Sequence, residues 1–147
     1  MAYNVKQFSD LISRTLVEIG LHSQEAVDLL LGTAAQESQF GTYLRQLGGG
    51  PALGAFQVEL VTFDDLQFRY ANWVPFVLQD RHHKELEWDL KLGIIVARLK
   101  YYSCPGPVPL TLRGQARYWK KYYNTEAGAG TVDEYLENWK RYVGVAE

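Results

Sequence analysis

A glutamate occupies the last turn of an otherwise apolar helix face in residues 24–38. Ala26, Leu30, Thr33 and Glu37 are spaced by four, three and four residues, so they share one face of a helix. Burial there disfavours a charged carboxylate, and the negative end of the helix dipole acts in the same direction. A carboxyl group that stays protonated near neutral pH is suited to general acid catalysis. The alternative is an ordinary glutamate at the edge of the buried face, satisfied by a partner.

The glycine-rich segment "GGGPALGAFQ" follows this helix, and glycine lets backbone approach a ligand closely. If the segment is extended, Phe56 and Gln57 point to opposite sides, so that Gln57 can face a cleft. Its amide offers both a donor and an acceptor to sugar hydroxyls or an acetamido group. Glu59 would lie on the same face as Gln57 and is a candidate for a second catalytic carboxylate.

A third group of polar residues lies near the other end of the chain, in "YWKKYYNTEAGAGT". Tyr123 and Asn124 close a predicted helix there, where their side chains could hydrogen-bond a substrate or the acid itself. The alternative is a helix end with two packed tyrosines and no contact with a ligand.

The elements that must position these residues are helices, and the sequence predicts a mostly α fold. Residues 1–147 contain no repeat, linker or low-complexity tract, which favours a single domain of six or seven helices. Residues 48–58 are too short for a sheet and predict a hairpin or an irregular loop near the cleft. Capping residues are expected at the following helix starts: Ser23, Thr62 with Asp65, Thr111, and Thr131 with Glu134. The longest periodic segment covers residues 84–102.

Composition restricts the classes of function that fit this chain of 147 residues. Hydrophobic residues make up 47% and charged residues 22%, which is enough to build a core. The net charge of −2 gives no case for nucleic-acid binding, and no apolar run is long enough for membrane insertion. The adjacent His82 and His83 lack the spacing of metal ligands, so neither a metal nor a cofactor is expected. Cys104 is the only cysteine, which excludes an internal disulfide.

Three short motifs, in order, resemble those of the lysozyme-like superfamily, within it the group of soluble lytic transglycosylases and goose-type lysozymes. The first is Glu-Ser-Gln-Phe at residues 37–40, and the second is Gly-Ala-Phe-Gln at residues 54–57. The third, Tyr-Tyr-Asn at residues 122–124, departs from the family because Thr-Glu stands where Ala-Gly is expected. The chain also looks like small lysozyme-like proteins of tailed bacteriophages.

The resemblance implies a single lysozyme-like domain that acts on the glycan strands of peptidoglycan. Glu37 would be the general acid that protonates the oxygen between N-acetylmuramic acid and N-acetylglucosamine. Gln57 would position the substrate, with Tyr123 and Asn124 near the acid, while Ser38 and Phe40 would hold the helix end. A phage protein of this kind would be made in the bacterial cytoplasm without a signal peptide and would act on the wall, either as an endolysin or with other virion proteins.

The reaction type stays open at the level of sequence. A hydrolase usually needs a second carboxylate, and the candidates are Glu59, Asp64 and Asp65. The two aspartates are more simply interpreted as residues of a first helical turn, where the helix dipole favours them. Lytic transglycosylases of the resembling group use one carboxyl group, because the 6-hydroxyl of the substrate attacks. Two further alternatives are a phage structural or assembly protein that keeps the fold without catalysis and a glycan-binding module.

Overall fold

The chain folds into helices joined by irregular loops in the computed structural model, which describes residues 1–73, 78–124 and 128–144. The helical elements are α1 (Val5–Glu18), α2 (Gln24–Ser38), α3 (Leu60–Arg69), the 3₁₀ turn η1 (His83–Glu87), α4 (Leu90–Tyr102), α5 (Leu112–Tyr118), the π-helical η2 (Trp119–Asn124), α6 (Val132–Asn138) and the π-helical η3 (Trp139–Val143). The described residues contain no β-strand, only isolated bridges that join Leu53 to Arg45 and to Val58. The prediction of a mostly α fold with a short hairpin or irregular loop is confirmed.

Side-chain caps set several of the helix starts, as the sequence predicts. Ser23 accepts a hydrogen bond from the Ala26 N–H at 3.1 Å, and Thr111 accepts one from the Gly114 N–H at 3.0 Å. Thr131 and Glu134 form a reciprocal capping box at the start of α6. Each cap accepts a hydrogen bond from a backbone N–H that has no partner within its helix. These helix starts can therefore be predicted from local sequence.

Two predicted helix starts are wrong. Helix α3 begins at Leu60, with Glu59 as its N-cap and no side-chain cap, so the expected capping box of Thr62 and Asp65 does not form. The chain enters this helix directly from Val58, where the hairpin ends. The segment 84–102 is also not one helix, because Asp89 interrupts it and caps α4 through the Leu92 N–H at 3.0 Å.

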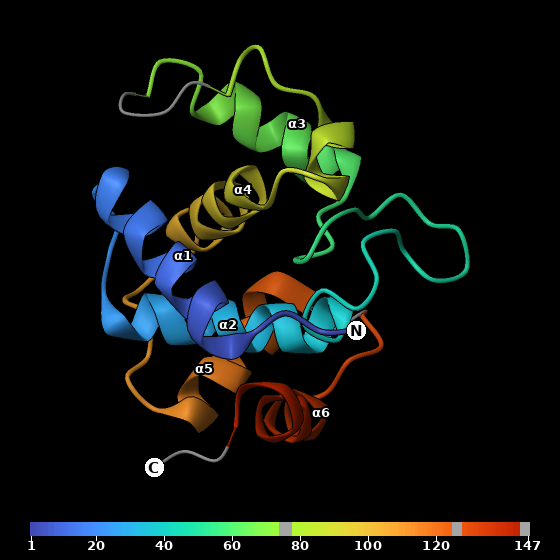
Figure 1. Cartoon of the computed structure of the whole chain (residues 1–147). Helices are drawn as coiled ribbons and strands as arrows, with labels where there is room; N and C mark the ends of the chain where they lie inside the picture. Colours follow the sequence, from blue (N-terminus) through green and yellow to red (C-terminus); the bar gives the residue numbers. More distant parts are fainter. Residues whose placement is uncertain (74–77, 125–127, 145–147) are drawn as a thin grey trace.

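Helix α2 lies at the centre of the molecule and packs against α1, α4, α5 and α6. Figure 1 shows α1 and α4 on one side of α2, and α5 and α6 on the other, with α3 beyond α4. Leu29, Leu30 and Ala34 are consequently buried. The carboxyl end of α2 leads into the loop of residues 40–58, which extends from the helical body (Figure 1). A polar side chain at this end of α2 is therefore held at the border between the core and solvent.

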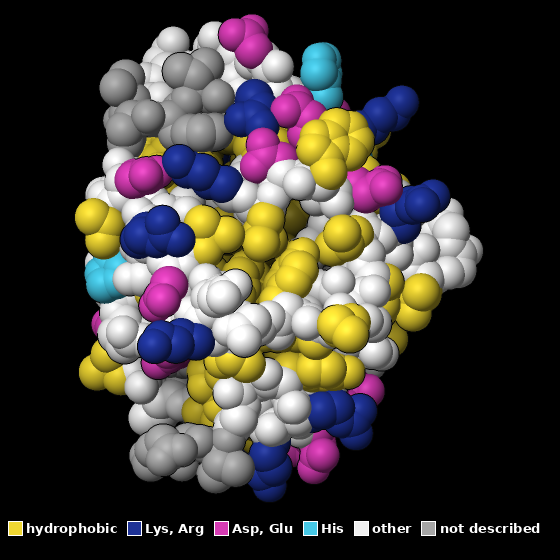
Figure 2. Space-filling view, viewed as in Figure 1, with side chains coloured by type: hydrophobic (Ala, Val, Ile, Leu, Met, Phe, Trp, Pro, Cys, Tyr) yellow, Lys and Arg dark blue, Asp and Glu magenta, His cyan; other side chains and the backbone are white. Residues whose placement is uncertain are grey.

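The surface carries charges of both signs. Figure 2 shows basic and acidic side chains interspersed on one face, with hydrophobic side chains in a band between them. This distribution agrees with the balance of 15 basic and 17 acidic residues. Among the described residues, no helix has both the length and the apolar character needed to span a bilayer.

Candidate active site

The end of α2 is shaped by an unusual run of left-handed backbone. Gln39, Phe40 and Gly41 have φ angles of 50°, 59° and 80°, and the first two carry side chains that make this conformation costly. A side chain at position 41 would collide with the Tyr3 ring, because a Cβ there would lie 2.3 Å from it. The chain therefore reverses immediately after Ser38 and leaves Glu37 in the last helical turn, beside the returning loop.

Ser38 and Phe40 hold this reversal in place. The fully buried Ser38 hydroxyl donates to the Ala55 carbonyl at 2.6 Å and accepts from the Gly41 N–H at 2.8 Å. The Phe40 ring is also fully buried and packs edge-on against Phe8, with 5.2 Å between the ring centroids. Both residues stabilise the helix end, as the sequence predicts, and Ser38 joins that end to the turn at residues 54–57.

This turn carries Gln57 into position. Leu53 and Val58 exchange two backbone hydrogen bonds of 3.1 and 3.0 Å, which close a hairpin around the four residues between them. Gln57 has a φ of 49°, so the expected extended backbone is wrong at this position. At the other end of the turn, Gly54 has a φ of 84°, and a Cβ there would lie 2.5 Å from the Leu86 carbonyl oxygen. The turn is tight because the hairpin is pressed against η1, and glycine is required for that contact.

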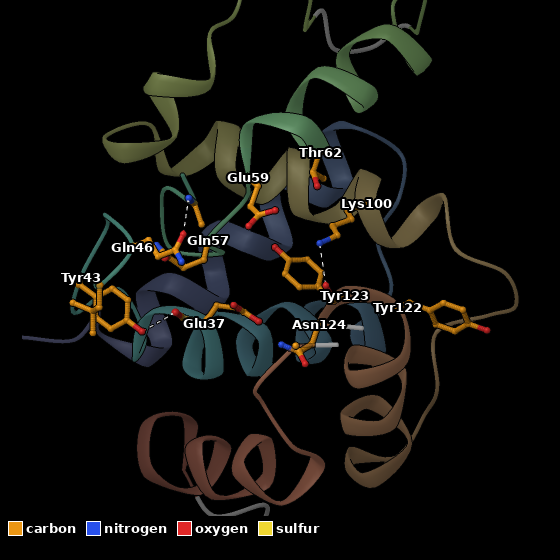
Figure 3. A pocket seen from close by; sticks show the side chains of 13 residues that line it. Glu37, Tyr43, Gln46, Gln57, Glu59, Thr62, Lys100, Tyr122, Tyr123 and Asn124 are labelled. Atoms are coloured by element: carbon orange, nitrogen blue, oxygen red, sulfur yellow. Dashed lines mark hydrogen bonds between the residues drawn. The ribbon is translucent and has the colours of Figure 1, made fainter. Parts of the chain in front are cut away.

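All five residues predicted for the site line one open cavity of about 680 Å³. The described residues around it are Glu37, Tyr43, Gln46, Leu47, Ala52, Gln57, Glu59, Thr62, Lys100, Tyr122, Tyr123, Asn124 and Gly128. Figure 3 shows Glu37 reaching up from α2, and Glu59 and Thr62 reaching down from the opposite wall. The volume is within the range of natural ligand sites, at roughly 300–1,000 Å³.

Glu37 is partly buried and has one side-chain partner. Its Oε2 accepts a hydrogen bond from the Trp119 indole N–H at 2.9 Å. Burial raises the pKa of the Glu37 carboxyl from 4.5 to about 7, while the Trp119 hydrogen bond and the positive charge of Lys100 lower it by less. A substantial fraction of the protein therefore carries a neutral, proton-bearing carboxyl group in the cavity at neutral pH. The sequence argument predicts this direction and this physical cause.

Tyr123 supports the site through its backbone, ring and hydroxyl. The hydroxyl is buried and donates to the Phe56 carbonyl at 2.6 Å, which ties η2 to the turn that carries Gln57. The Lys100 ammonium donates to the Tyr123 carbonyl at 3.2 Å and lies 3.7 Å from the centroid of the tyrosine ring. The tyrosine hydroxyl is thus committed to the protein, so we expect its contribution to a ligand to come from the ring that faces the cavity.

Polar side-chain atoms with no hydrogen-bond partner among the described residues also line the cavity. Gln57 donates through Nε2 to the Gly54 carbonyl at 2.9 Å, which leaves its Oε1 as an acceptor. Asn124 accepts through Oδ1 from the Lys120 ammonium at 2.9 Å, which leaves its Nδ2 as a donor. Glu59 is exposed at the start of α3. The cavity therefore combines one acid with an amide acceptor, an amide donor and a solvated carboxylate.

Trp119 and Lys100 interact with Glu37 and were missed by sequence reasoning. Trp119 precedes Tyr123 by four residues, so both fall on one side of a helical segment, and this spacing could have drawn attention to it. Lys100 stands in the buried helix "GIIVARLKYY", where a lysine needs a polar environment. Neither signal identifies Glu37 as the partner, because α2, α4 and η2 meet only in the folded chain.

The cavity offers no site for a metal in the part of the chain that the structure describes, where no group of three or more His, Cys, Asp or Glu side chains could hold one. His83 instead hydrogen-bonds the Val58 carbonyl through Nε2 at 2.7 Å, and His82 caps η1. The arrangement is suited to proton transfer from Glu37 to a polar ligand. No family model, curated protein or solved structure matches this chain.

Proposed function

We propose that this protein cleaves the glycan strands of bacterial peptidoglycan at the bond between N-acetylmuramic acid and N-acetylglucosamine, with Glu37 as the general acid. The observation that carries the proposal is the position of Glu37, which lies partly buried in an open cavity with a pKa raised to about 7 by that burial. An acid of this pKa is protonated often enough to act near neutral pH and is strong enough to give up its proton.

The cavity residues support a division of roles around the scissile bond. Glu37 would donate its proton to the glycosidic oxygen as the bond to the muramic acid ring breaks. The resulting carboxylate would be stabilised by the Trp119 N–H at 2.9 Å and by the positive charge of Lys100. The amide atoms of Gln57 and Asn124 that have no partner among the described residues would orient the sugar through its hydroxyl or acetamido groups.

Further support comes from the three sequence motifs that resemble the lysozyme-like superfamily. The third motif lies more than 60 residues after the second, yet each of the three lines the same cavity: Glu37 from the first, Gln57 from the second, and Tyr122, Tyr123 and Asn124 from the third. A chance resemblance gives no reason for these segments to meet. In this reading the partner is the glycan strand, and the acetamido groups and hydroxyls of the sugar are what the cavity recognises.

The second step of the reaction is open to two chemistries. If Glu59 activates a water molecule or attacks the sugar, the protein is a muramidase and releases reducing muramic acid ends. If the 6-hydroxyl of the muramic acid attacks its own ring and gives its proton back to the Glu37 carboxylate, the protein is a lytic transglycosylase and releases anhydro-sugar ends. Mass spectrometry of digested peptidoglycan separates the two, because the anhydro product is lighter by one water molecule.

The Glu37→Gln variant tests the proposal on purified peptidoglycan. Glutamine keeps the shape and the acceptor for Trp119 but cannot donate an acidic proton, so we expect the rate of fragment release to fall by roughly 10²–10⁴-fold. The Glu25→Gln variant, at the opposite end of the same helix, is the matched control and should retain wild-type activity. Retained activity in Glu37→Gln would refute the assignment. A wild-type protein that binds cell walls but releases no fragments would instead be a glycan-binding module or a non-catalytic phage protein.

A further inference from the structure

The indole of Trp119 is the only side chain that hydrogen-bonds the Glu37 carboxyl in the described part of the chain. Trp119 is fully buried and comes from η2, far from α2 in sequence. Its N–H donates to Oε2 at 2.9 Å, and no hydrogen bond from a described residue reaches Oε1. The two oxygens of the acid are therefore not equivalent.

This difference follows from the chemistry of indole. An indole N–H can donate a hydrogen bond but cannot accept one. When Glu37 is protonated, the oxygen that contacts Trp119 accepts this hydrogen bond, and the carbonyl oxygen of a carboxylic acid is a stronger acceptor than its hydroxyl oxygen. The acidic proton is then carried by the other oxygen, Oε1.

We propose that Trp119 is a positioning residue whose N–H holds Oε2 of Glu37 as an acceptor and so presents the acidic proton on Oε1, the oxygen left without a protein partner. This inference rests on the proposed function, in which Glu37 gives that proton to the glycosidic oxygen. The same N–H remains in place after the transfer and stabilises the carboxylate that forms.

The surroundings of Trp119 fix the donor before substrate arrives. Its ring packs against the buried ring of Tyr135, with 5.4 Å between the centroids. Gly130 leaves no room for a side chain beside it, since a Cβ there would lie 2.6 Å from the indole. Trp119 also begins the π-helical segment, which turns the chain differently from a regular helix, and such segments often occur at functional sites. A donor held in this way needs no rearrangement during the reaction.

The experiment compares two replacements at position 119 in the full-length protein. Trp119→Phe removes the N–H and part of the ring, whereas benzothienylalanine at position 119 keeps the bicyclic shape and removes only the N–H. The Trp139→Phe variant is the matched control, because the Nε1 of the partly buried Trp139 has no hydrogen-bond partner in the described structure. Two quantities are measured for each protein: the titration of Glu37 by carbon NMR of its labelled carboxyl, and the pH dependence of kcat on peptidoglycan.

We expect both N–H-free proteins to show a higher Glu37 pKa than wild type, since the hydrogen bond that lowers it is gone. Activity should then persist to higher pH on the alkaline side. At low pH, where Glu37 is fully protonated in every variant, kcat should fall roughly 10- to 100-fold, because the proton is no longer confined to one oxygen. Trp139→Phe should change neither quantity.

Two results would overturn the inference. An unchanged Glu37 titration in the benzothienylalanine protein would show that the N–H does not engage the carboxyl group. A raised Glu37 pKa with an unchanged low-pH kcat would show that the hydrogen bond has an electrostatic effect but no positioning role. The NMR titration needs no substrate, so failure of the proposed function, which appears as an inactive wild-type protein, is distinguished from failure of the Trp119–Glu37 contact.

Discussion

Two glutamates line the same cavity from opposite walls, and their surroundings differ in almost every respect. Glu37 ends the central helix α2, is partly buried, and accepts a hydrogen bond from Trp119. Glu59 precedes α3, is exposed, and makes no side-chain cap to that helix. Figure 3 shows the two carboxyl groups facing the same open space. One residue type therefore meets two environments within one site.

The difference shows that packing, and not proximity to a helix end, assigns the chemistry of each carboxyl group. Helix α2 is covered on both sides by other helices, so a side chain at its end loses water, and the neutral acid is favoured. Helix α3 lies at the outside of the molecule (Figure 1), and the side chain of Glu59 before it is exposed to solvent. One cavity thus combines a desolvated carboxyl group with a solvated one.

The largest effect expected from this comparison is on stability. The Glu37 pKa is about 7 in the folded protein against 4.5 for a free side chain. Well below pH 4.5 the group is neutral in both states and folding is not penalised. Between pH 4.5 and 7 the unfolded state loses the proton while the folded state keeps it, so the penalty grows across this window and is complete above pH 7. Glu37→Gln should therefore raise the free energy of unfolding by about 3 kcal/mol at pH 8 relative to wild type, and by close to zero at pH 4.

Denaturant unfolding of both proteins at the two pH values measures this effect. The expected result is a variant that is more stable and less active than wild type, the combination typical of a residue kept for function at the expense of stability. Equal stability of Glu37→Gln and wild type at pH 8 would mean that Glu37 is already well solvated, and the contrast with Glu59 would then disappear.

The corresponding change at Glu59 should be much smaller. Because its side chain is exposed and uncapped, we expect Glu59→Gln to change the free energy of unfolding by less than about 0.5 kcal/mol at either pH. Its effect on fragment release should be less than about tenfold, as for a solvated charge that orients substrate without taking part in proton transfer. A loss as large as that of Glu37→Gln would instead identify Glu59 as the second carboxylate of a hydrolase.

Most of the fold can be predicted from local sequence because the residues that cap its helices act within a few positions of each helix start. Ser23, Thr111 and Thr131 each cap a helix through a backbone donor only three residues away. The prediction failed at Thr62, where a good capping pattern lies inside α3. The hairpin ends at Val58, so the helix is capped at Glu59, three residues before Thr62, and a tertiary connection overrides the local signal.

A site residue can be predicted where its type is unusual for the local sequence around it. Glu37 stands out because it interrupts an apolar stripe, and Gln57 because it follows glycines. The route by which Gln57 reaches the cavity could not be predicted, since its left-handed backbone belongs to a tight turn packed against Leu86, which is distant in sequence. The hydrogen bond of Trp119 to Glu37 and the electrostatic interaction of Lys100 with Glu37 could not be predicted either, because each joins segments more than 60 residues apart in sequence.

Lys100 interacts electrostatically with both glutamates of the comparison, Glu37 and Glu59. The smallest of the expected effects concerns this residue. Burial lowers its pKa, whereas the charges of Glu37 and Glu59 both raise it, so it is close enough to feel both carboxylates. In return its positive charge lowers the pKa of Glu37, by less than the Trp119 hydrogen bond does. Lys100→Met should therefore move the alkaline limit of activity to higher pH, in the same direction as Trp119→Phe but less far.

The measurement is the ratio of kcat at pH 8 to kcat at pH 6, which should rise in Lys100→Met by less than tenfold, since a tenfold change corresponds to one full pKa unit. Lys91→Met is the matched control, because Lys91 lies on the same helix in an exposed ion pair with Glu18 and does not line the cavity. A ratio that falls in Lys100→Met would mean that the ammonium acts on the substrate and not on the acid. Glu37 would then depend on Trp119 alone for the stabilisation of its carboxylate.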